Sequence, residues 1–150
     1  MTGKYYEELE VGAVFQHQPS RTVTESDNLL ITTLTHNPQP LHLDAEFAGA
    51  SIHGQILVNS IFTLGLAVGL SVSDTTLGTT LGNLGFDKTV FPNPVFVGDT
   101  LTAETKVVDK RESQTKPDRG IVTFEHILTN QRGEVVCSCL RSGMMMRQPT

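Results

Sequence analysis

Residues 56–72 read ILVNSIFTLGLAVGLSV, and they lie within a longer segment, 47–73, that contains no Asp, Glu, Lys or Arg. A helix that is apolar on nearly every side is typical of an element that the rest of its domain buries. Its two glycines, Gly65 and Gly69, allow neighbouring elements to approach closely. We therefore predict a long central helix against which the other elements of the fold pack.

The same segment also fits a second interpretation, because a GxxxG pair in an apolar stretch is typical of packed transmembrane helices. The run is at the short limit for crossing a bilayer, and the polar residues Asn59, Ser60 and Thr63 interrupt it. We therefore predict a helix buried in a soluble domain and expect no membrane contact.

The elements before this helix follow from turn and cap residues. Residues 14–23 read as a first strand. Thr24 begins a capping pattern for a short helix that ends near Thr35. Two prolines then stiffen the loop 36–42, so that this loop holds His42 in a defined place.

Stretches rich in β-branched residues follow the long helix at residues 76–90, 98–111, 120–129 and 134–146. In the second stretch apolar and polar residues alternate, which is typical of a sheet with one covered face. A tight turn at 130–133 joins the last two. This order of elements predicts an α+β fold in a single domain over residues 1–150, with an antiparallel β-sheet wrapped around a long central apolar helix.

Composition limits the partners and the compartment. The chain has 150 residues and a net charge of -5, from 11 Lys and Arg against 16 Asp and Glu, without a basic run. This charge argues against nucleic acid as a partner. The first residues lack a long apolar leader, so we expect a cytoplasmic protein.

The cysteines and histidines predict neither a disulfide nor a metal site. Cys137 and Cys139 stand two apart on one expected strand, which is an awkward separation for a bond, so we expect reduced thiols. His17, His36 and His126 lack partners at the spacing that metal ligands require.

Three segments occur in a defined order: NPQPLHLDAEFA at residues 37–48, the long apolar helix, and FPNPVFVGDTL at residues 91–101. The first is similar to a pattern with an acid five residues before a catalytic histidine and a carboxylate after it. The third is similar to a Phe-x-x-Pro-Val-x-x-Gly-Asp strand entry. Together they resemble the MaoC-like hydratases of the hot-dog fold, over residues 14 to 147.

The resemblance implies addition of water to, or its removal from, the 2,3 double bond of a trans-2-enoyl-CoA thioester, without a cofactor other than the CoA of the substrate. His42 matches the catalytic histidine, and imidazole exchanges protons near neutral pH. Asn37 stands where the family has an Asp, and Gln39 where it often has Asn. Asp44 is expected to orient a neighbouring group or to cap a helix start.

Asn37 leaves two interpretations open, because its carboxamide can orient a water molecule but cannot accept a proton. In the first, His42 is the single acid and base while Asn37 positions the water. In the second, hydration is impaired and the domain only binds acyl-CoA. We favour the first, because His42 and its loop are retained.

The resemblance also implies that a backbone amide at the start of the long helix binds the thioester oxygen as negative charge develops on it. His53-Gly54 looks like the His-Gly pair that the family has there, but it lies about six residues too early by an ungapped count. That count places the donor at Asn59-Ser60, which we favour. Gly54 remains the alternative donor. If Asn59-Ser60 is the donor, His53 is only a loop histidine.

Phosphates of CoA need cationic partners, and the basic residues near the loop 113–120 are candidates. We assign Arg111 and Lys116 to substrate binding, with Lys110 and Arg119 beside them. A solvated strand edge is the equally weighted alternative. Active sites of the fold commonly form across a dimer, so we expect a homodimer or a larger even assembly.

Three functions are weighed. The first is an enoyl-CoA hydratase or 3-hydroxyacyl-CoA dehydratase, with a loop similar to the branch that acts on short methyl-branched or dicarboxylic substrates of the mesaconyl or itaconyl type. The second is a hot-dog thioesterase, which the absence of acidic residues from 55–73 disfavours. The third is a non-catalytic acyl-CoA-binding or subunit domain.

Overall fold

The computed structural model describes residues 3–149 of the chain. Its helices and strands, in chain order, are η1 (Tyr6–Glu8), β1 (Val14–Gln16), β2 (Arg21–Thr22), α1 (Glu25–Leu34), η2 (Pro40–His42), α2 (Ala45–Gly49), α3 (Ser60–Thr75), β3 (Thr80–Val90), β4 (Thr100–Glu112), β5 (Arg119–Thr129) and β6 (Val135–Met146).

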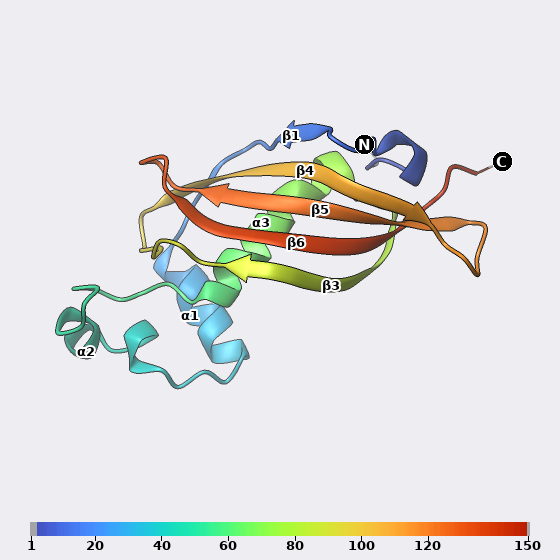
Figure 1. Cartoon of the computed structure of the whole chain (residues 1–150). Helices are drawn as coiled ribbons and strands as arrows, with labels where there is room; N and C mark the ends of the chain where they lie inside the picture. Colours follow the sequence, from blue (N-terminus) through green and yellow to red (C-terminus); the bar gives the residue numbers. More distant parts are fainter. Residues whose placement is uncertain (1–2, 150) are drawn as a thin grey trace.

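The strands form a sheet in the order β1-β4-β5-β6-β3, with β2 pairing to β4 off this path. Every pair is antiparallel, and the β5–β6 pairing continues to the predicted turn at 130–133. α3 lies across one face of the sheet, as Figure 1 shows. The predicted α+β fold with an antiparallel sheet against a long helix is therefore confirmed.

One stripe of α3 faces the sheet, and its buried residues recur every four positions with small side chains: Thr63, Ala67, Ser71 and Thr75. Small side chains let the helix lie close to the sheet. The opposite side is open in the isolated chain, where Ile61 is 52% exposed and Gly65 and Gly69 are exposed. Within one chain the sheet therefore packs against one side of the helix, and the other side stays open.

α3 begins at Ser60, four residues later than the apolar run suggested. Asn59 ends the preceding extended segment and caps the helix, because its side-chain oxygen accepts a hydrogen bond from Ile61 N–H. Before it, Val58 N–H donates to Val95 C=O. The apolar residues before Asn59 therefore do not extend α3. Leu57 and Val58 form part of a cavity wall, and Phe47 and Ala48 belong to the short helix α2.

The expected first strand, residues 14–23, is divided into β1 and β2. The residues between them bend, and Pro19 has no N–H to donate to a strand. His17 N–H still donates to Ala103 C=O, so the segment stays against β4. The bend leaves the His17 side chain buried in the core.

Two apolar clusters lie on the helix side of the sheet. The first includes Val58, Leu101 and Leu128, and the second includes Val107 and Phe124. The strand residues between them are polar and also buried: Thr105, His126 and Arg141. A polar layer therefore separates the core near the start of α3 from the core near the chain termini.

Hydrogen bonds cross this polar layer in one direction. Arg141 Nε donates to His126 Nε2 over 2.9 Å, so His126 carries its proton on Nδ1 and donates to Thr105 Oγ1 over 2.8 Å. The Thr105 hydroxyl then donates to His17 Nε2, and His17 Nδ1 donates to Asp74 Oδ2, each over 2.7 Å. In this series of hydrogen bonds His126, Thr105 and His17 each accept one bond and donate one.

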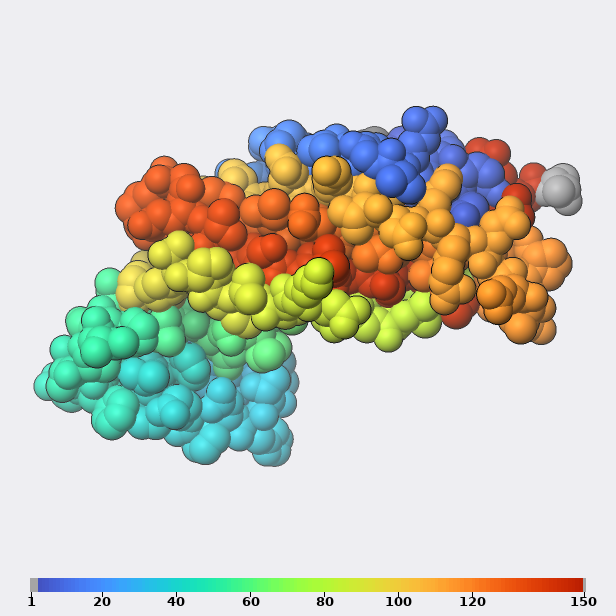
Figure 2. Space-filling model, viewed as in Figure 1, coloured from blue at the N-terminus to red at the C-terminus, as the bar shows by residue number. Residues whose placement is uncertain are grey.

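Residues of α1, η2 and α2 project from one end of the sheet as a separate lobe, coloured cyan to teal in Figure 2. The N- and C-terminal segments lie at the other end of the sheet in Figure 1. Between residues 3 and 149, no helix is both long and apolar enough to cross a membrane.

Candidate active site

His42 lies in the short helix η2, and its ring has a fixed orientation. Nδ1 lies 2.6 Å from the carbonyl oxygen of Leu57. A carbonyl can only accept, so Nδ1 carries the proton and donates, which leaves Nε2 of the neutral ring as an acceptor. This is the arrangement that a general base requires.

A cavity of about 440 Å³ lies between the lobe, the start of α3 and the segment that follows β3. Its wall is mainly apolar, from Leu41, Leu57, Val58, Phe91, Pro92, Pro94, Val95 and Val136. The polar residues in the wall are His42, His53, Ser60, Thr63 and Asn93. A mostly apolar cavity with a few polar groups is typical of a small-molecule site.

The start of α3 provides an amide donor at this cavity. Ser60 lines the cavity, and its N–H has no hydrogen-bond partner among the residues that the structure describes. Free N–H groups and the helix dipole together favour negative charge at a helix start. Asn59 itself is a buried cap and does not line the cavity. Gly54 lies in a turn, outside the cavity wall, and is not at the helix start.

Asn37 lies within its own loop and not in the cavity wall. Its side-chain oxygen accepts a hydrogen bond from Gln39 N–H over 3.0 Å, which forms a local turn before η2. Gln39 is exposed and also lies outside the cavity wall. The proposed contact of these two residues with water or substrate therefore stays a prediction.

Asp44 is a helix cap, one of its two expected roles. Its carboxylate oxygen accepts hydrogen bonds from the N–H groups of Glu46 and Phe47 at the start of α2, each over 3.0 Å. Asp44 thereby fixes the chain just after His42.

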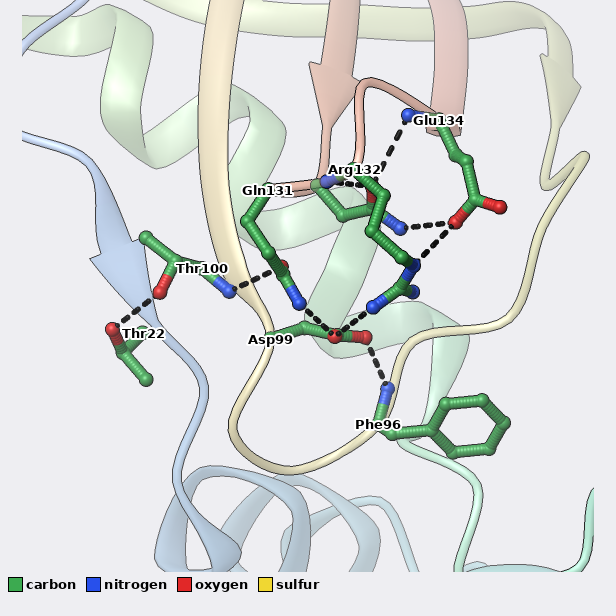
Figure 3. A network of polar contacts seen from close by, with 8 residues as sticks. Thr22, Phe96, Asp99, Thr100, Gln131, Arg132 and Glu134 are labelled. Atoms are coloured by element: carbon green, nitrogen blue, oxygen red, sulfur yellow. Dashed lines mark hydrogen bonds and ion pairs between the residues drawn. The ribbon is translucent and has the colours of Figure 1, made fainter.

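Asp99 holds the opposite wall of the cavity in place (Figure 3). Its carboxylate accepts hydrogen bonds from Phe96 N–H, from the Gln131 side chain and from Arg132. Burial alone raises the pKa of Asp99, but these three donors outweigh it and hold the pKa below its ordinary value. The Gly-Asp sequence recognised in the third segment thus joins the segment after β3 to the β5–β6 turn.

The basic residues assigned to CoA are not at this cavity within one chain. A strand rises about 3.3 Å per residue, so Arg111 lies roughly 35 Å along β4 from Thr100. Lys116 follows in the β4–β5 connection, at the end of the sheet away from the lobe (Figure 1). Arg119 pairs with Asp118. Within a single chain the length of β4 thus separates Arg111 and Lys116 from His42, and their assignment to the phosphates of CoA stays a prediction.

Two residues that sequence reasoning missed lie behind the site. Asn28 and Thr32 of α1 are buried, and their side chains bond to the His42 segment and to Asn59. Their spacing of four in a helix is the only local signal. His53, expected to be only a loop residue if the helix start lay at Asn59-Ser60, also lines the cavity, with its ring edge against Phe96.

The MaoC like domain family matches residues 7–130. The chain belongs to this family. The MaoC-like match covers the His42 loop, the start of α3 and Asp99, so the residues that line the cavity lie within the matched part, except Val136.

Three known proteins illustrate the similarity of this MaoC-like chain. Mesaconyl-CoA hydratase of Cereibacter sphaeroides is 30% identical over 148 residues, 99% of this chain and 43% of that protein. The chain thus spans less than half the length of that relative. A solved MaoC-like dehydratase from Rhodospirillum rubrum is 32% identical with a TM-score of 0.84, covering 99% of this chain and all of the other.

The fold of this MaoC-like chain is a hot-dog fold. A Mycobacterium tuberculosis protein described as a double hotdog fold matches with a TM-score of 0.88 at 24% identity, over 98% of this chain and 45% of that one. Two units of this kind are therefore joined in one chain in that protein.

Proposed function

We propose that this chain hydrates the 2,3 double bond of an enoyl-CoA thioester, or catalyses the reverse dehydration. One observation carries the proposal. The accepting Nε2 of His42 and the N–H of Ser60, which has no partner between residues 3 and 149, belong to residues that line the same cavity. A base and an oxyanion donor at one apolar cavity are the two groups that this addition needs.

In the proposed mechanism, water attacks C3 and His42 Nε2 takes a proton from it. The electron pair of the double bond moves toward the thioester, and the Ser60 N–H donates to the thioester oxygen as it becomes an enolate oxygen. The imidazolium then returns the proton to C2. The hydroxyl at C3 and the hydrogen at C2 together account for one water molecule.

For the substrate we propose a short enoyl-CoA, either methyl-branched or dicarboxylic. The cavity volume of about 440 Å³ and its largely apolar wall suit a short acyl group. The name of the relative from Cereibacter sphaeroides supports the mesaconyl type. Besides His42 and Ser60, the polar wall residues are His53, Thr63 and Asn93, and these three are available to a second carboxylate.

We also propose that the working form is a homodimer. β3 is an edge strand of eleven residues, and Leu81, Leu84 and Phe86 on it are each about 40% exposed or more. Ile61 on the open side of α3 adds to this apolar surface. A long apolar edge strand normally requires a cover, and the double hotdog relative supports a second unit as that cover.

The proposal is tested by incubating the protein with crotonyl-CoA, 2-methylcrotonyl-CoA and mesaconyl-CoA. Loss of the conjugated thioester absorbance without free thiol supports hydration. Release of free thiol supports a thioesterase instead. Binding of the CoA esters without either change supports a domain that only binds acyl-CoA.

A further inference from the structure

Asn28 in α1 uses its whole carboxamide to join the two halves of the proposed site. Its Nδ2 donates to the carbonyl oxygen of His42 over 3.0 Å. Its Oδ1 accepts a hydrogen bond from Asn59 N–H over 2.9 Å. Asn28 is only 1% exposed, so solvent does not compete for either bond.

Each of these bonds lies directly beside one of the reacting groups. One ends on the backbone of the proposed base, His42. The other ends on the residue whose peptide bond leads into the Ser60 N–H. A change in the Asn28 carboxamide therefore shifts the base and the oxyanion donor relative to each other.

Thr32, one turn further along α1, makes a second pair of contacts to the same segments. Its hydroxyl accepts a hydrogen bond from Asn59 Nδ2 over 3.2 Å, and its carbonyl accepts one from Asn37 N–H over 3.0 Å. α1 packs against both η2 and α3. The buried polar face of α1 thus contacts the His42 loop and the cap of α3 at several points.

α1 is inverted relative to an ordinary surface helix. It buries Asn28 and Thr32, whereas Leu30 is 61% exposed and Leu34 is 73% exposed. Asn also disfavours a helix interior, because its side chain competes with the backbone for hydrogen bonds. The buried polar pair instead supplies hydrogen-bond partners to the segments around it, and an apolar residue at position 28 would leave His42 C=O and Asn59 N–H without them.

We propose that Asn28 is a positioning residue for the reaction, which sets the geometry between the His42 imidazole and the Ser60 N–H. This inference rests on the proposed function. A misplacement of about 1 Å at a reacting group can lower a rate about 100-fold, and such losses fall on kcat when substrate binding is unchanged.

The first test is Asn28→Ala, assayed with the enoyl-CoA that the parent hydrates. We expect kcat to fall about 10-fold to 100-fold, with KM changing less than about 3-fold. In a His42→Ala background the same substitution should lower kcat much less, because residues that act as a unit are not additive. An equal loss in both backgrounds would overturn the proposal, as would a folded Asn28→Ala protein with the parent kcat.

Thr105→Val is the matched control. It also removes buried hydrogen bonds and keeps the side-chain shape, but Thr105 lies in the polar layer of the sheet, outside the cavity wall. We expect this variant to lose stability and to keep the parent kcat. If both variants lost kcat in proportion to their loss of stability, Asn28 would have only a structural role.

Asn28→Asp keeps the proposal testable if the alanine variant does not fold. A neutral carboxyl can donate its O–H to His42 C=O and accept from Asn59 N–H, as the carboxamide does, whereas a carboxylate cannot donate. We therefore expect the ratio of variant to parent kcat to be highest at low pH and to fall as the pH rises. A ratio that does not change with pH would contradict the proposal.

A measurement without substrate separates failure of this inference from failure of the proposed function. Imidazole ¹⁵N shifts report which ring nitrogen carries the proton, and His42→Ala identifies the His42 signal. We expect the Nδ1–H form in the parent and a mixture of forms in Asn28→Ala. A parent without hydratase activity would overturn the function, whereas unchanged His42 shifts in Asn28→Ala would overturn the positioning role.

Discussion

Leu57 C=O accepts a 2.6 Å hydrogen bond from His42 Nδ1, and this bond links two segments fifteen residues apart. Leu57 N–H also donates to the carbonyl oxygen of Leu41, the residue before His42, so Leu57 bonds to both residues. The ring is thereby oriented by backbone that leads directly into α3. The base and the helix start are thus parts of one connected unit.

Asn37→Ala tests whether the Asn37 side chain orients the attacking water. If it does, the variant loses one hydrogen bond to that water, and kcat should fall about 5-fold to 10-fold with little change in KM. Asn37→Asp should retain activity and add a second ionisation to the pH profile. An alanine variant that hydrates at the parent rate would remove Asn37 from the mechanism.

Asp99→Asn should lower the free energy of unfolding by about 3 kcal/mol, because it replaces a buried carboxylate that three donors hold. The pKa of Asp99 is lowered in the folded chain. Its stabilisation is therefore complete above the pKa of an unfolded Asp, about 3.9, and is lost as the pH falls through the folded pKa. Denaturant unfolding of parent and variant between pH 7 and pH 3 measures this.

Asp118→Asn is the matched control, since Asp118 also pairs with an arginine but is exposed to solvent. We expect its unfolding midpoint to match that of the parent throughout this pH range. Equal effects of the two substitutions would mean that Asp99 does not stabilise the cavity wall.

His126 should stay neutral far below the usual range of histidine. Burial, the charge of Arg141 and the neighbouring His17 lower the pKa of His126 to about 3. Since the unfolded chain takes up a proton near pH 6.5 and the folded chain does not, stability falls with pH below 6.5. This loss is about 2 kcal/mol by pH 5 from this residue alone.

Proton NMR of the ring resonances tests this value. We expect the His126 signal to remain unchanged from pH 8 to pH 4.5. A His126 signal that moves with a midpoint near 6.5 would contradict a buried, neutral His126 ring held between Arg141 and Thr105.

Light scattering of the purified chain should give twice the monomer mass, or a larger even multiple. Leu84→Arg on the exposed edge of β3 should shift the protein toward monomer, because a charge replaces apolar contact area. Val11→Arg is the control, since Val11 is 58% exposed but lies outside the β3 edge and α3. A fully active monomeric parent would contradict a shared site.

Local patterns predicted most of the fold. The Thr24 cap predicted α1 within a residue of its observed start, because capping depends on neighbours in sequence. Stretches rich in β-branched residues predicted β4 to β6, and alternation within β4 predicted its covered face. The division of the first strand was missed, although Pro19, which cannot donate to a strand, is a local signal for it.

Site residues were predicted from the sequence only where local signals set their positions. His42 and Ser60 do line one cavity, since their loop and helix start are set by local signals. Asn28 was missed, because its partners lie 14 and 31 residues away. The distance of Arg111 and Lys116 from His42 in one chain could not be predicted, because sequence proximity to a loop does not reveal the length of the strand that leads to it.

The central claim is that His42 is the acid and base of an enoyl-CoA hydration. The most direct measurement is kcat of His42→Ala against the parent, with His36→Asn as a control at an exposed histidine of positive φ, which Asn accepts. We predict a loss of about 100-fold or more in His42→Ala, with folding intact and His36→Asn at the parent rate. A folded His42→Ala protein that hydrates enoyl-CoA at near the parent rate would contradict the account.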